Sequence, residues 1–170
     1  MVELVKYSAK HRADIVMILN NENVAKWLLS PPFPYTEKDA DYFLDKCSQI
    51  NENGISVHFA VEKEGRMIGG TGLKKAKDGK TEVGYYIAEE HWNKGYGTEV
   101  LNRMLGIGFA NPEINEIYAE VFEGNAASER IILKCGFRFL RESGPLTKNG
   151  IVHKARLFVI SKTEYDSIRK

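Results

Sequence analysis

The sequence has few of the features that mark secreted or membrane proteins. Only two of its 170 residues are cysteines, Cys47 and Cys135, and its first residues lack the apolar core of a signal peptide. No stretch approaches the roughly 20 apolar residues of a membrane-spanning helix. We therefore expect no disulfide bond, no membrane contact and a cytoplasmic protein with reduced thiols. We expect Cys135 to be a small buried packing residue.

The sequence also lacks an excess of charge of either sign. Its 24 Lys and Arg residues nearly balance 23 Asp and Glu residues, which leaves a formal net charge of +1. A protein that binds nucleic acid without regard to sequence needs a basic excess on one face. We therefore expect no nucleic-acid partner, and we expect no metal site. An apolar content of 43% and this chain length suit a single domain spanning residues 1–170.

The apolar pattern predicts strands interleaved with helices. Glycine-bearing turns separate three of the expected strands, which is typical of an antiparallel meander. A turn at 51–54 should end the second helix. The expected strands are 2–7, 55–62, 66–76, 81–88, 116–122, and two that begin at 137 and 151; the expected helices are 9–19, 36–50, 95–110 and 126–135. The order predicts an α+β fold with a mixed sheet.

A proline-rich segment interrupts this pattern between the first two helices. Three prolines fall in the four positions from 31 to 34, and such a run excludes a helix interior. We expect residues 24–35 to form an ordered loop. Its aromatic residues, Trp27, Phe33 and Tyr35, either line a binding site or pin the loop to the core.

The segment from Trp92 to Glu99 has the physical character of an anion site. It follows a strand-like run and precedes an amphipathic helical run, and it contains Gly95 and Gly97. The first turn of a helix has backbone N–H groups without intrahelical partners, and the helix dipole adds partial positive charge there. Glycines let a phosphate approach the backbone closely. This loop is predicted to hold the pyrophosphate of a nucleotide-bearing cofactor.

Three segments together resemble the GNAT superfamily of acetyl-CoA-dependent N-acetyltransferases. They are Glu82–Ile87, Trp92–Glu99, and Asn125–Ser128 with Lys134–Phe137. Within the superfamily, the chain resembles the branch that acetylates N-terminal residues of ribosomal proteins. The element order also matches, so the resemblance covers nearly the whole chain. It implies a mostly antiparallel sheet of about seven strands that splays in its centre, with helices on both faces.

The resemblance implies acetyl-CoA as the cofactor and a mode of binding it. Pantetheine would lie in the gap of the splayed sheet, and pyrophosphate would lie on the N–H groups of the glycine loop. Trp92 stands where many superfamily members have Gln or Arg. The residues implied in cofactor binding are Tyr86, Ile87, Ala88, Trp92, Asn93, Lys94, Gly95, Tyr96, Gly97, Thr98, Asn125 and Ser128.

One position departs from the superfamily pattern. Many members carry a Tyr five residues before the Phe of the Gly-Phe pair, where it protonates the leaving thiolate. That position here is Ile132, and a hydrocarbon cannot donate a proton. The resemblance offers Ser128 in its place, to hydrogen-bond or protonate the sulfur. Alternatively, Ser128 is a first-turn residue that satisfies the helix backbone.

The amine that attacks the thioester must be neutral, which raises the question of a base. A free α-amino group has a pKa of about 7.7–8.0, against about 10.4 for lysine, so an N-terminal amine needs only modest help. Glu82 is the first candidate, and Glu120 and His153 are the others. Each carboxylate is alternatively a solvated strand residue or an ion-pair partner, and His58 is expected to be structural or edge-exposed.

We therefore expect acetyl transfer to a primary amine, first of all the N-terminal α-amine of a protein or peptide. A second possibility is a small amine such as a polyamine, an aminoglycoside or an amino-acid analogue. A third is a non-catalytic module that binds or senses acyl-CoA. The acceptor would be framed by residues 27–35 and 144–151, and the protein is expected to be a monomer or a homodimer. A polyamine would require a cluster of acidic side chains, for which the sequence offers Glu22, Glu37, Asp39 and Asp41.

Overall fold

The computed structural model describes residues 1–50, 56–76 and 78–169, with the backbone alone at 48–50. The expected turn at 51–54 therefore lies outside the described residues. The sheet has seven strands, which are β1 (Glu3–Lys6), β2 (Val57–Lys63), β3 (Arg66–Lys75), β4 (Thr81–Ile87), β5 (Glu116–Phe122), β6 (Arg138–Lys148) and β7 (Ile151–Ser161). Their order is β1-β2-β3-β4-β5-β7-β6, and each neighbouring pair is antiparallel except β4 and β5. The α+β fold and the mostly antiparallel sheet are confirmed.

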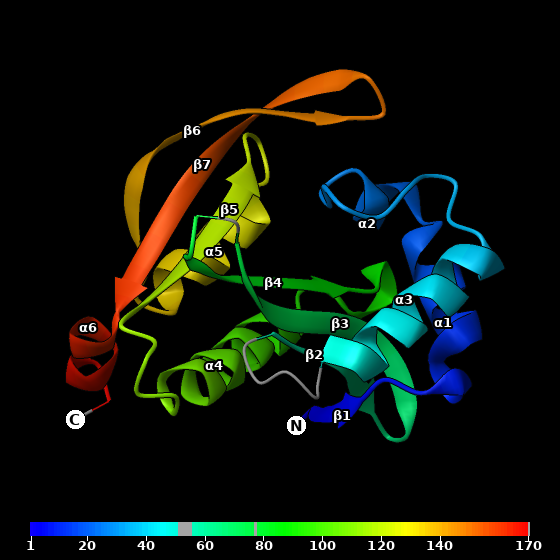
Figure 1. Cartoon of the computed structure of the whole chain (residues 1–170), viewed down its shortest axis with the longest axis horizontal. Helices are drawn as coiled ribbons and strands as arrows, with labels where there is room; N and C mark the ends of the chain where they lie inside the picture. Colours follow the sequence, from blue (N-terminus) through cyan, green and yellow to red (C-terminus); the bar gives the residue numbers. More distant parts are fainter. Residues whose placement is uncertain (51–55, 77, 170) are drawn as a thin grey trace.

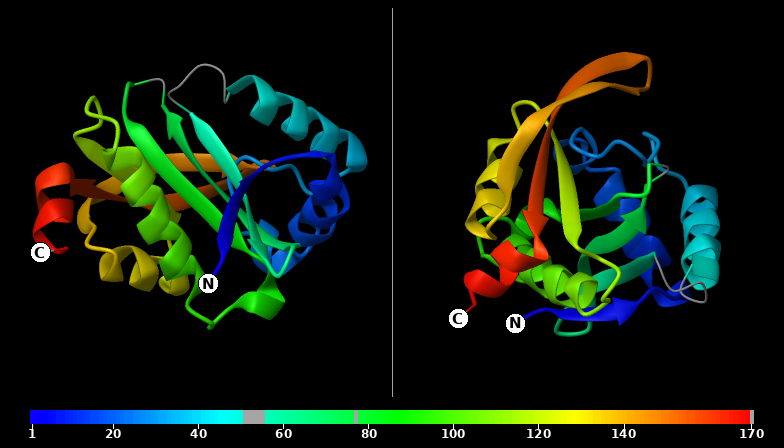
Figure 2. Two further views of the ribbon diagram at one scale, coloured as in Figure 1. Left: turned by 90° about the horizontal axis from the view of Figure 1, so that it is seen from below. Right: turned by 60° about the vertical axis from the view of Figure 1, so that its left-hand side comes forward.

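Helices cover both faces of this sheet (Figures 1 and 2). The helices are α1 (Arg12–Leu19), α2 (Glu22–Ala25), α3 (Glu37–Ile50), α4 (Tyr96–Phe109), α5 (Ala126–Lys134) and α6 (Lys162–Ser167). We call the face under α1 and α3 the front face, and the face under α4 and α5 the back face. None of the helices in the described part of the chain is both long and apolar enough to cross a membrane.

Two apolar cores hold these layers together. On the back face, α4 buries Val100, Leu101, Met104 and Leu105 completely, the spacing of one helical stripe. On the front face, residues of α1 and α3 pack with Tyr86 of β4. Both cysteines are buried and free, and burial raises the pKa of Cys47 to about 12 and that of Cys135 to about 11. Cys135 is therefore the packing residue that the sequence predicted.

Three elements differ from the expectation. The loop predicted at 24–35 begins inside α2, a single turn whose N-cap is Asn21. Strand β6 continues past Pro145, because a proline without an N–H is tolerated in an edge strand and the register shifts between Ser143 and Leu146. Helix α6 begins at a capping box formed by Ser161 and Glu164, a Ser-x-x-Glu pattern that was readable in the sequence.

Candidate active site

Strands β4 and β5 separate immediately after they meet. Their parallel pairing comprises only Thr81 with Ile117 and Glu82 with Tyr118, although both strands continue for several residues. Strand β5 then remains paired with β7, and Figure 1 shows β4 and β5 diverging. The edges of two central strands are thereby left open to a ligand.

The glycine loop stands at the C-terminal end of β4 and begins α4. Gly95 is the N-cap of α4 with a φ of 83°, in the left-handed region that favours glycine, and no side chain caps the helix. A Cβ at Gly95 would meet no heavy atom within 4 Å, so the backbone is accessible there. Glu99 is the residue whose N–H donates to the Gly95 carbonyl, at 3.1 Å. The N–H groups that precede Glu99 in the first turn of α4 have no acceptor within the helix, and they therefore fit a pyrophosphate.

Trp92 connects this loop to the end of β4. Its indole Nε1 donates a hydrogen bond of 2.7 Å to the carbonyl of Ile87, a local role that suits a Trp in place of Gln or Arg. The N–H of Ala88 donates to the carbonyl of Ile68 at 2.8 Å. Ala88 therefore has no N–H to offer a bound pantetheine. Alternate residues of a strand face the same neighbour, so the N–H of Tyr86 also points to β3, and the expected backbone pairing rests on the N–H of Ile87.

Asn125 and Ser128 stand on the α5 side of the gap. Asn125 is the N-cap of α5, and its Oδ1 accepts a hydrogen bond of 3.2 Å from the backbone N–H of Ser128. The hydroxyl of Ser128 instead lies 3.3 Å from the phenolic oxygen of Tyr85. Asn125, and not the Ser128 hydroxyl, therefore caps this helix.

Tyr85 is a functional candidate that the sequence reasoning missed. It reaches from β4 to α5 on the back face, and its ring lies beneath the glycine loop, where a Cβ on Gly97 would be 3.3 Å from Cε2 of Tyr85. Burial raises the pKa of Tyr85 to about 12, so its hydroxyl keeps its proton near neutral pH. Ile132 is only 2% exposed and packs in the back core, which leaves Tyr85 as the phenol beside Ser128.

On the front face, Gly84 leaves an open stretch of backbone beside the gap, whereas the ring of His58 lies over the neighbouring Gly72. His58, Gly72 and Gly84 lie in one row across β2, β3 and β4. Gly84 is exposed, and a Cβ there would meet no heavy atom within 4 Å. Glu82 and Tyr86 flank it along β4, as the alternation of side chains predicted. We call this open stretch at Gly84, bounded by the His58 ring over Gly72, the glycine trough.

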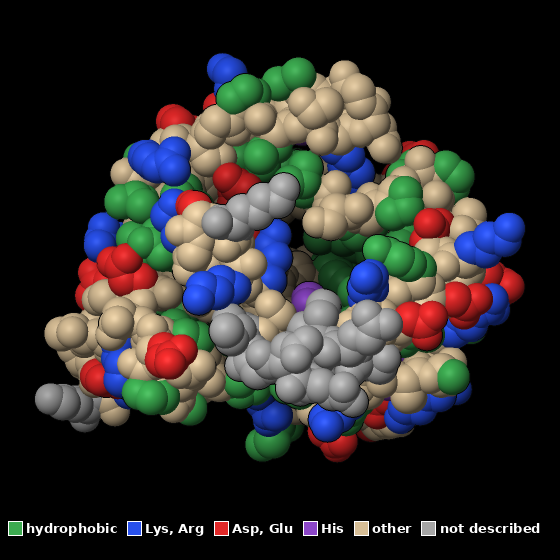
Figure 3. Space-filling view, in the orientation of Figure 1, with side chains coloured by type: hydrophobic (Ala, Val, Ile, Leu, Met, Phe, Trp, Pro, Cys, Tyr) green, Lys and Arg blue, Asp and Glu red, His purple; other side chains and the backbone are tan. Residues whose placement is uncertain are grey.

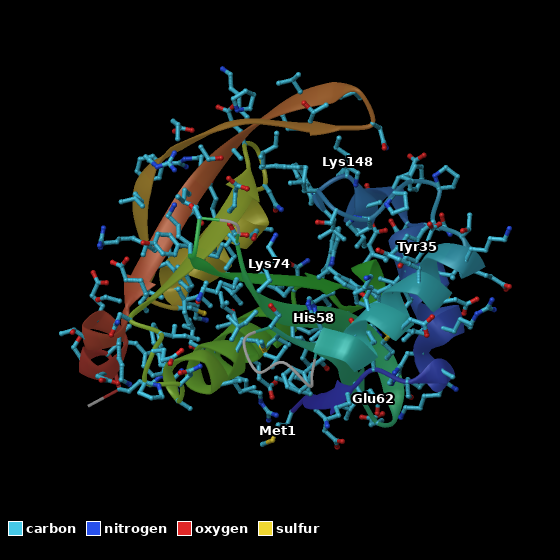
Figure 4. The ribbon with its side chains drawn as sticks, in the orientation of Figure 1. Met1, Tyr35, His58, Glu62, Lys74 and Lys148 are labelled. Atoms are coloured by element: carbon cyan, nitrogen blue, oxygen red, sulfur yellow. The ribbon has the colours of Figure 1, made fainter. Side chains whose placement is uncertain are left out.

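Charged groups border the glycine trough. Glu82 forms an ion pair with Lys74, in which Oε2 of Glu82 lies 3.1 Å from Nζ of Lys74. Burial and, to a smaller extent, the nearby charge of Lys74 lower the pKa of His58, so its imidazole is neutral near pH 7. Figure 4 shows His58 and Lys74 near the centre of the molecule. His58 is thus a half-buried, neutral residue of the front face.

The β6–β7 hairpin extends over the front face of the sheet. Figures 1 and 2 show the hairpin projecting past the end of β5 and bending toward α2. Lys148, near its tip, is only 8% exposed, and its ammonium donates to the carbonyl of Ala25 at 2.6 Å and to that of Leu28. Figure 3 shows a hollow with apolar side chains in its wall, bordered by the hairpin and the helices of the front face. We call it the front hollow.

The remaining base candidates lie on two other strands, Glu120 on β5 and His153 on β7. Glu120 is exposed on β5, opposite Leu157 of β7. The ring of His153 stacks on Phe122, with centroids 4.7 Å apart. The structure places Glu82, by contrast, in the last residue pair before the strands separate.

A model of the acetyltransferase (GNAT) domain matches residues 2–138 of this chain. The chain belongs to the GNAT acetyltransferase family. The uncharacterized N-acetyltransferase YoaA of Bacillus subtilis is 35% identical over 89 residues, which cover 51% of this chain and 49% of that protein. The matched region thus spans about half the length of this curated relative.

Two solved structures share the fold of this GNAT domain at low sequence identity. One is described as a ribosomal L7/L12 alpha-N-protein acetyltransferase, RimL, in complex with coenzyme A; it has a TM-score of 0.80 at 14% identity, over 94% of this chain and 93% of that one. The other is a spermidine N-acetyltransferase from Vibrio cholerae with CoA and spermine. Its TM-score is 0.77 at 22% identity, over 96% and 97% of the two chains.

GNAT enzymes use acetyl-CoA, which supplies an activated acetyl group as a thioester. The residues of this GNAT domain fit that cofactor on two observations: the accessible Gly95 backbone at the start of α4 and the open edges of β4 and β5. Three residues in or near this region escaped the sequence reasoning. They are Tyr85, Gly84 and Lys148. Tyr85 and Gly84 belong to the Gly-Tyr pattern of β4, which could have drawn attention to them, whereas the sequence carries no local signal for Lys148.

Proposed function

We propose that this chain transfers the acetyl group of acetyl-CoA to the α-amine of a protein or peptide N-terminus. The observation that carries the proposal is the open glycine trough at Gly84. It lies beside the point where β4 and β5 separate, on the front face of the sheet. An extended N-terminus needs only a narrow path lined by backbone, and a side chain at Gly84 would obstruct that path.

Glu82 is the group that we assign to proton removal. Its neighbour along the front face of β4 is Gly84, so its carboxylate stands at the wall of the trough, where Lys74 holds it in place. A carboxylate acting through one water is sufficient for an α-amine, because about a fifth of such groups are already neutral near pH 7.3. A lysine side chain, with a pKa of about 10.4, would need stronger assistance.

The acidic residues near α3 argue against a polyamine as the preferred acceptor. Arg12 binds Glu37 at 2.9 Å and Asp41 at 2.6 Å. The Asp39 carboxylate accepts a hydrogen bond of 2.7 Å from the backbone N–H of Thr36, at the start of α3. Three of the four acids that the sequence offered are therefore occupied within the chain. A groove that recognises several ammonium groups would need such carboxylates to be free.

The RimL structure, which its description assigns to the α-amine of a ribosomal protein, supports the same assignment, whereas the spermidine enzyme represents the runner-up. The deciding experiment measures thiol release from acetyl-CoA with four acceptors. These are a peptide with a free N-terminus and no lysine, an N-acetylated peptide with one lysine, spermidine, and an aminoglycoside. We expect turnover of the first peptide alone.

Turnover of spermidine or the aminoglycoside in preference to the first peptide would overturn this proposal in favour of a small-amine acetyltransferase. Tight CoA binding without turnover of any acceptor would favour the sensing module.

Replacing the proposed base gives a second test. Glu82→Gln should lower turnover most below neutral pH, where more of the acceptor is protonated and removal of its proton matters most. Glu120→Gln is the matched control, because Glu120 lies on the neighbouring strand but farther from the trough. We expect its pH–rate profile to follow the parent protein. If the Glu82→Gln profile also coincides with the parent's, Glu82 is not the base.

A further inference from the structure

One polar contact spans the gap between β4 and α5. The phenolic oxygen of Tyr85 and the hydroxyl oxygen of Ser128 are 3.3 Å apart, although the residues are 43 positions apart in the sequence. Neither hydroxyl caps a helix, because Asn125 supplies the cap of α5. The two hydroxyls therefore form a pair of their own beside the expected path of the cofactor.

This pair stands one helical turn from the position where a phenol is missing. Ser128 and Ile132 are four residues apart on α5, so their side chains project from the same side of the helix. Ile132 points into the back core and offers no donor. A phenol at Tyr85 therefore reaches the same neighbourhood from the opposite strand.

We propose that Tyr85 is a positioning residue that orients the Ser128 hydroxyl toward the sulfur of the cofactor. Tyr85 donates its proton in a hydrogen bond to Ser128 Oγ, and the Ser128 O–H is thereby directed away from Tyr85 and into the gap. The proposal rests on the acetyl transfer proposed above. It adds the residue that compensates for the hydrocarbon at Ile132.

The balance of the transfer step shows what the pair contributes. A bond forms between the acceptor nitrogen and the acetyl carbonyl carbon, the carbon–sulfur bond breaks, and its electron pair stays on sulfur. Ser128 donates a hydrogen bond to that sulfur while Tyr85 supports Ser128. Both hydroxyls keep their protons, since the pKa of Tyr85, about 12, exceeds that of a thiol, about 8.5. The amine loses one proton to Glu82 or water, and the thiolate takes up one proton from solvent, so the protons balance.

The surroundings of Tyr85 favour this geometry. Its ring lies close to Gly97 of α4 and packs against the back core. Besides burial, Cys135 at the C-cap of α5 raises the pKa of Tyr85, and that thiol is itself buried with a raised pKa. The phenol is thus held in one place with Ser128 as its polar partner, in a region of low polarity where hydrogen bonds are strengthened.

The first test titrates the thiol of bound CoA, followed by the ultraviolet absorbance of the thiolate, without any acceptor. If Ser128 and Tyr85 stabilise the thiolate, Tyr85→Phe should raise the pKa of the bound thiol by about one unit. Affinity for desulfo-CoA should stay unchanged. Tyr42→Phe is the control, because Tyr42 is an exposed residue of α3. An unaltered thiol pKa in Tyr85→Phe overturns the proposal.

The second test is a double-mutant cycle on turnover with the best acceptor. Tyr85→Phe should lower kcat by up to about tenfold, the upper end of the loss expected for one neutral hydrogen bond, and should leave the KM for acetyl-CoA unchanged. In a Ser128→Ala background the same substitution should have little further effect. Independent, multiplicative losses would overturn the proposal. Because the thiol titration needs no acceptor, its result stands even if the proposed acceptor class is wrong.

Discussion

The two halves of the proposed active site are built from different materials. The cofactor half consists of backbone: an N-cap glycine in the left-handed region and the open edges of two strands. The acceptor half, by contrast, is bordered by segments far apart in the chain: the hairpin meets the segment after α2 where Lys148 donates to the carbonyl of Leu28, 120 positions away. A backbone site demands little of the sequence beyond its glycines. A side-chain site can change its acceptor while the cofactor half stays the same.

The largest effect should come from the cofactor half, at Gly95. Gly95→Val would place a β-branched residue at a φ of 83°, which is strongly disfavoured. We expect CoA affinity to fall more than about tenfold, measured by calorimetry, from strain of about 1–3 kcal/mol in the loop. Gly65→Val is the matched control, since Gly65 also has a positive φ of 77° and open space but lies in the β2–β3 turn. Equal losses of CoA affinity in both variants would show that the effect is global.

On the acceptor side, Gly84→Val should separate the two halves. The site has room for a side chain and its φ is not positive, so the fold should tolerate the change. The added group would fill the glycine trough, and we expect the KM for the acceptor to rise about tenfold, equivalent to about 1.4 kcal/mol. CoA affinity should stay within about twofold of the parent's. If Gly84→Val instead loses CoA affinity and keeps its KM for the acceptor, the trough belongs to the cofactor half and the proposal is wrong.

A smaller effect on the acceptor half should follow from Lys148→Met, which removes the link between the hairpin and α2. The carbonyls of Ala25 and Leu28 would lose their donor, at a cost of about 1–3 kcal/mol to docking of the hairpin. We expect a several-fold rise in acceptor KM and faster proteolysis of the hairpin, with unchanged CoA affinity. Lys154→Met, at an exposed lysine of β7, controls for loss of charge. Unchanged proteolysis of Lys148→Met would show that the hairpin is held by other contacts.

The smallest effect concerns His58 and pH. Burial lowers the pKa of His58 in the folded chain, so the unfolded chain binds a proton between its ordinary pKa of about 6.5 and the lower folded value. The free energy of unfolding should therefore fall as the pH drops below about 6.5. His58→Gln should flatten this dependence in urea unfolding. A parent-like slope in His58→Gln would show that His58 is hydrated in the folded state.

The sequence predicted the features that depend on neighbouring residues better than those that depend on contacts between distant segments. The strand at 81–87, the glycine loop and helix 96–109 follow each other directly, and their periodicity and glycines are local signals. Glu82, Gly84 and Tyr86 were expected to share a face, and they do. His58 was expected at an edge or in a structural role, because nothing in its neighbours along the chain shows that β2 pairs with β3 at Gly72.

By itself, the sequence determined the fold class and the family, through the order of its strands, helices and motifs, and it determined the loop that fits the cofactor, whose residues lie close together in the chain. Only the tertiary structure decided that Tyr85 meets Ser128, that Lys74 meets Glu82, and that Lys148 joins the hairpin to α2. Such contacts depend on strand register, and a shift of one residue would turn every side chain of a strand to the opposite face. The acceptor half is therefore a product of sheet pairing rather than of any motif.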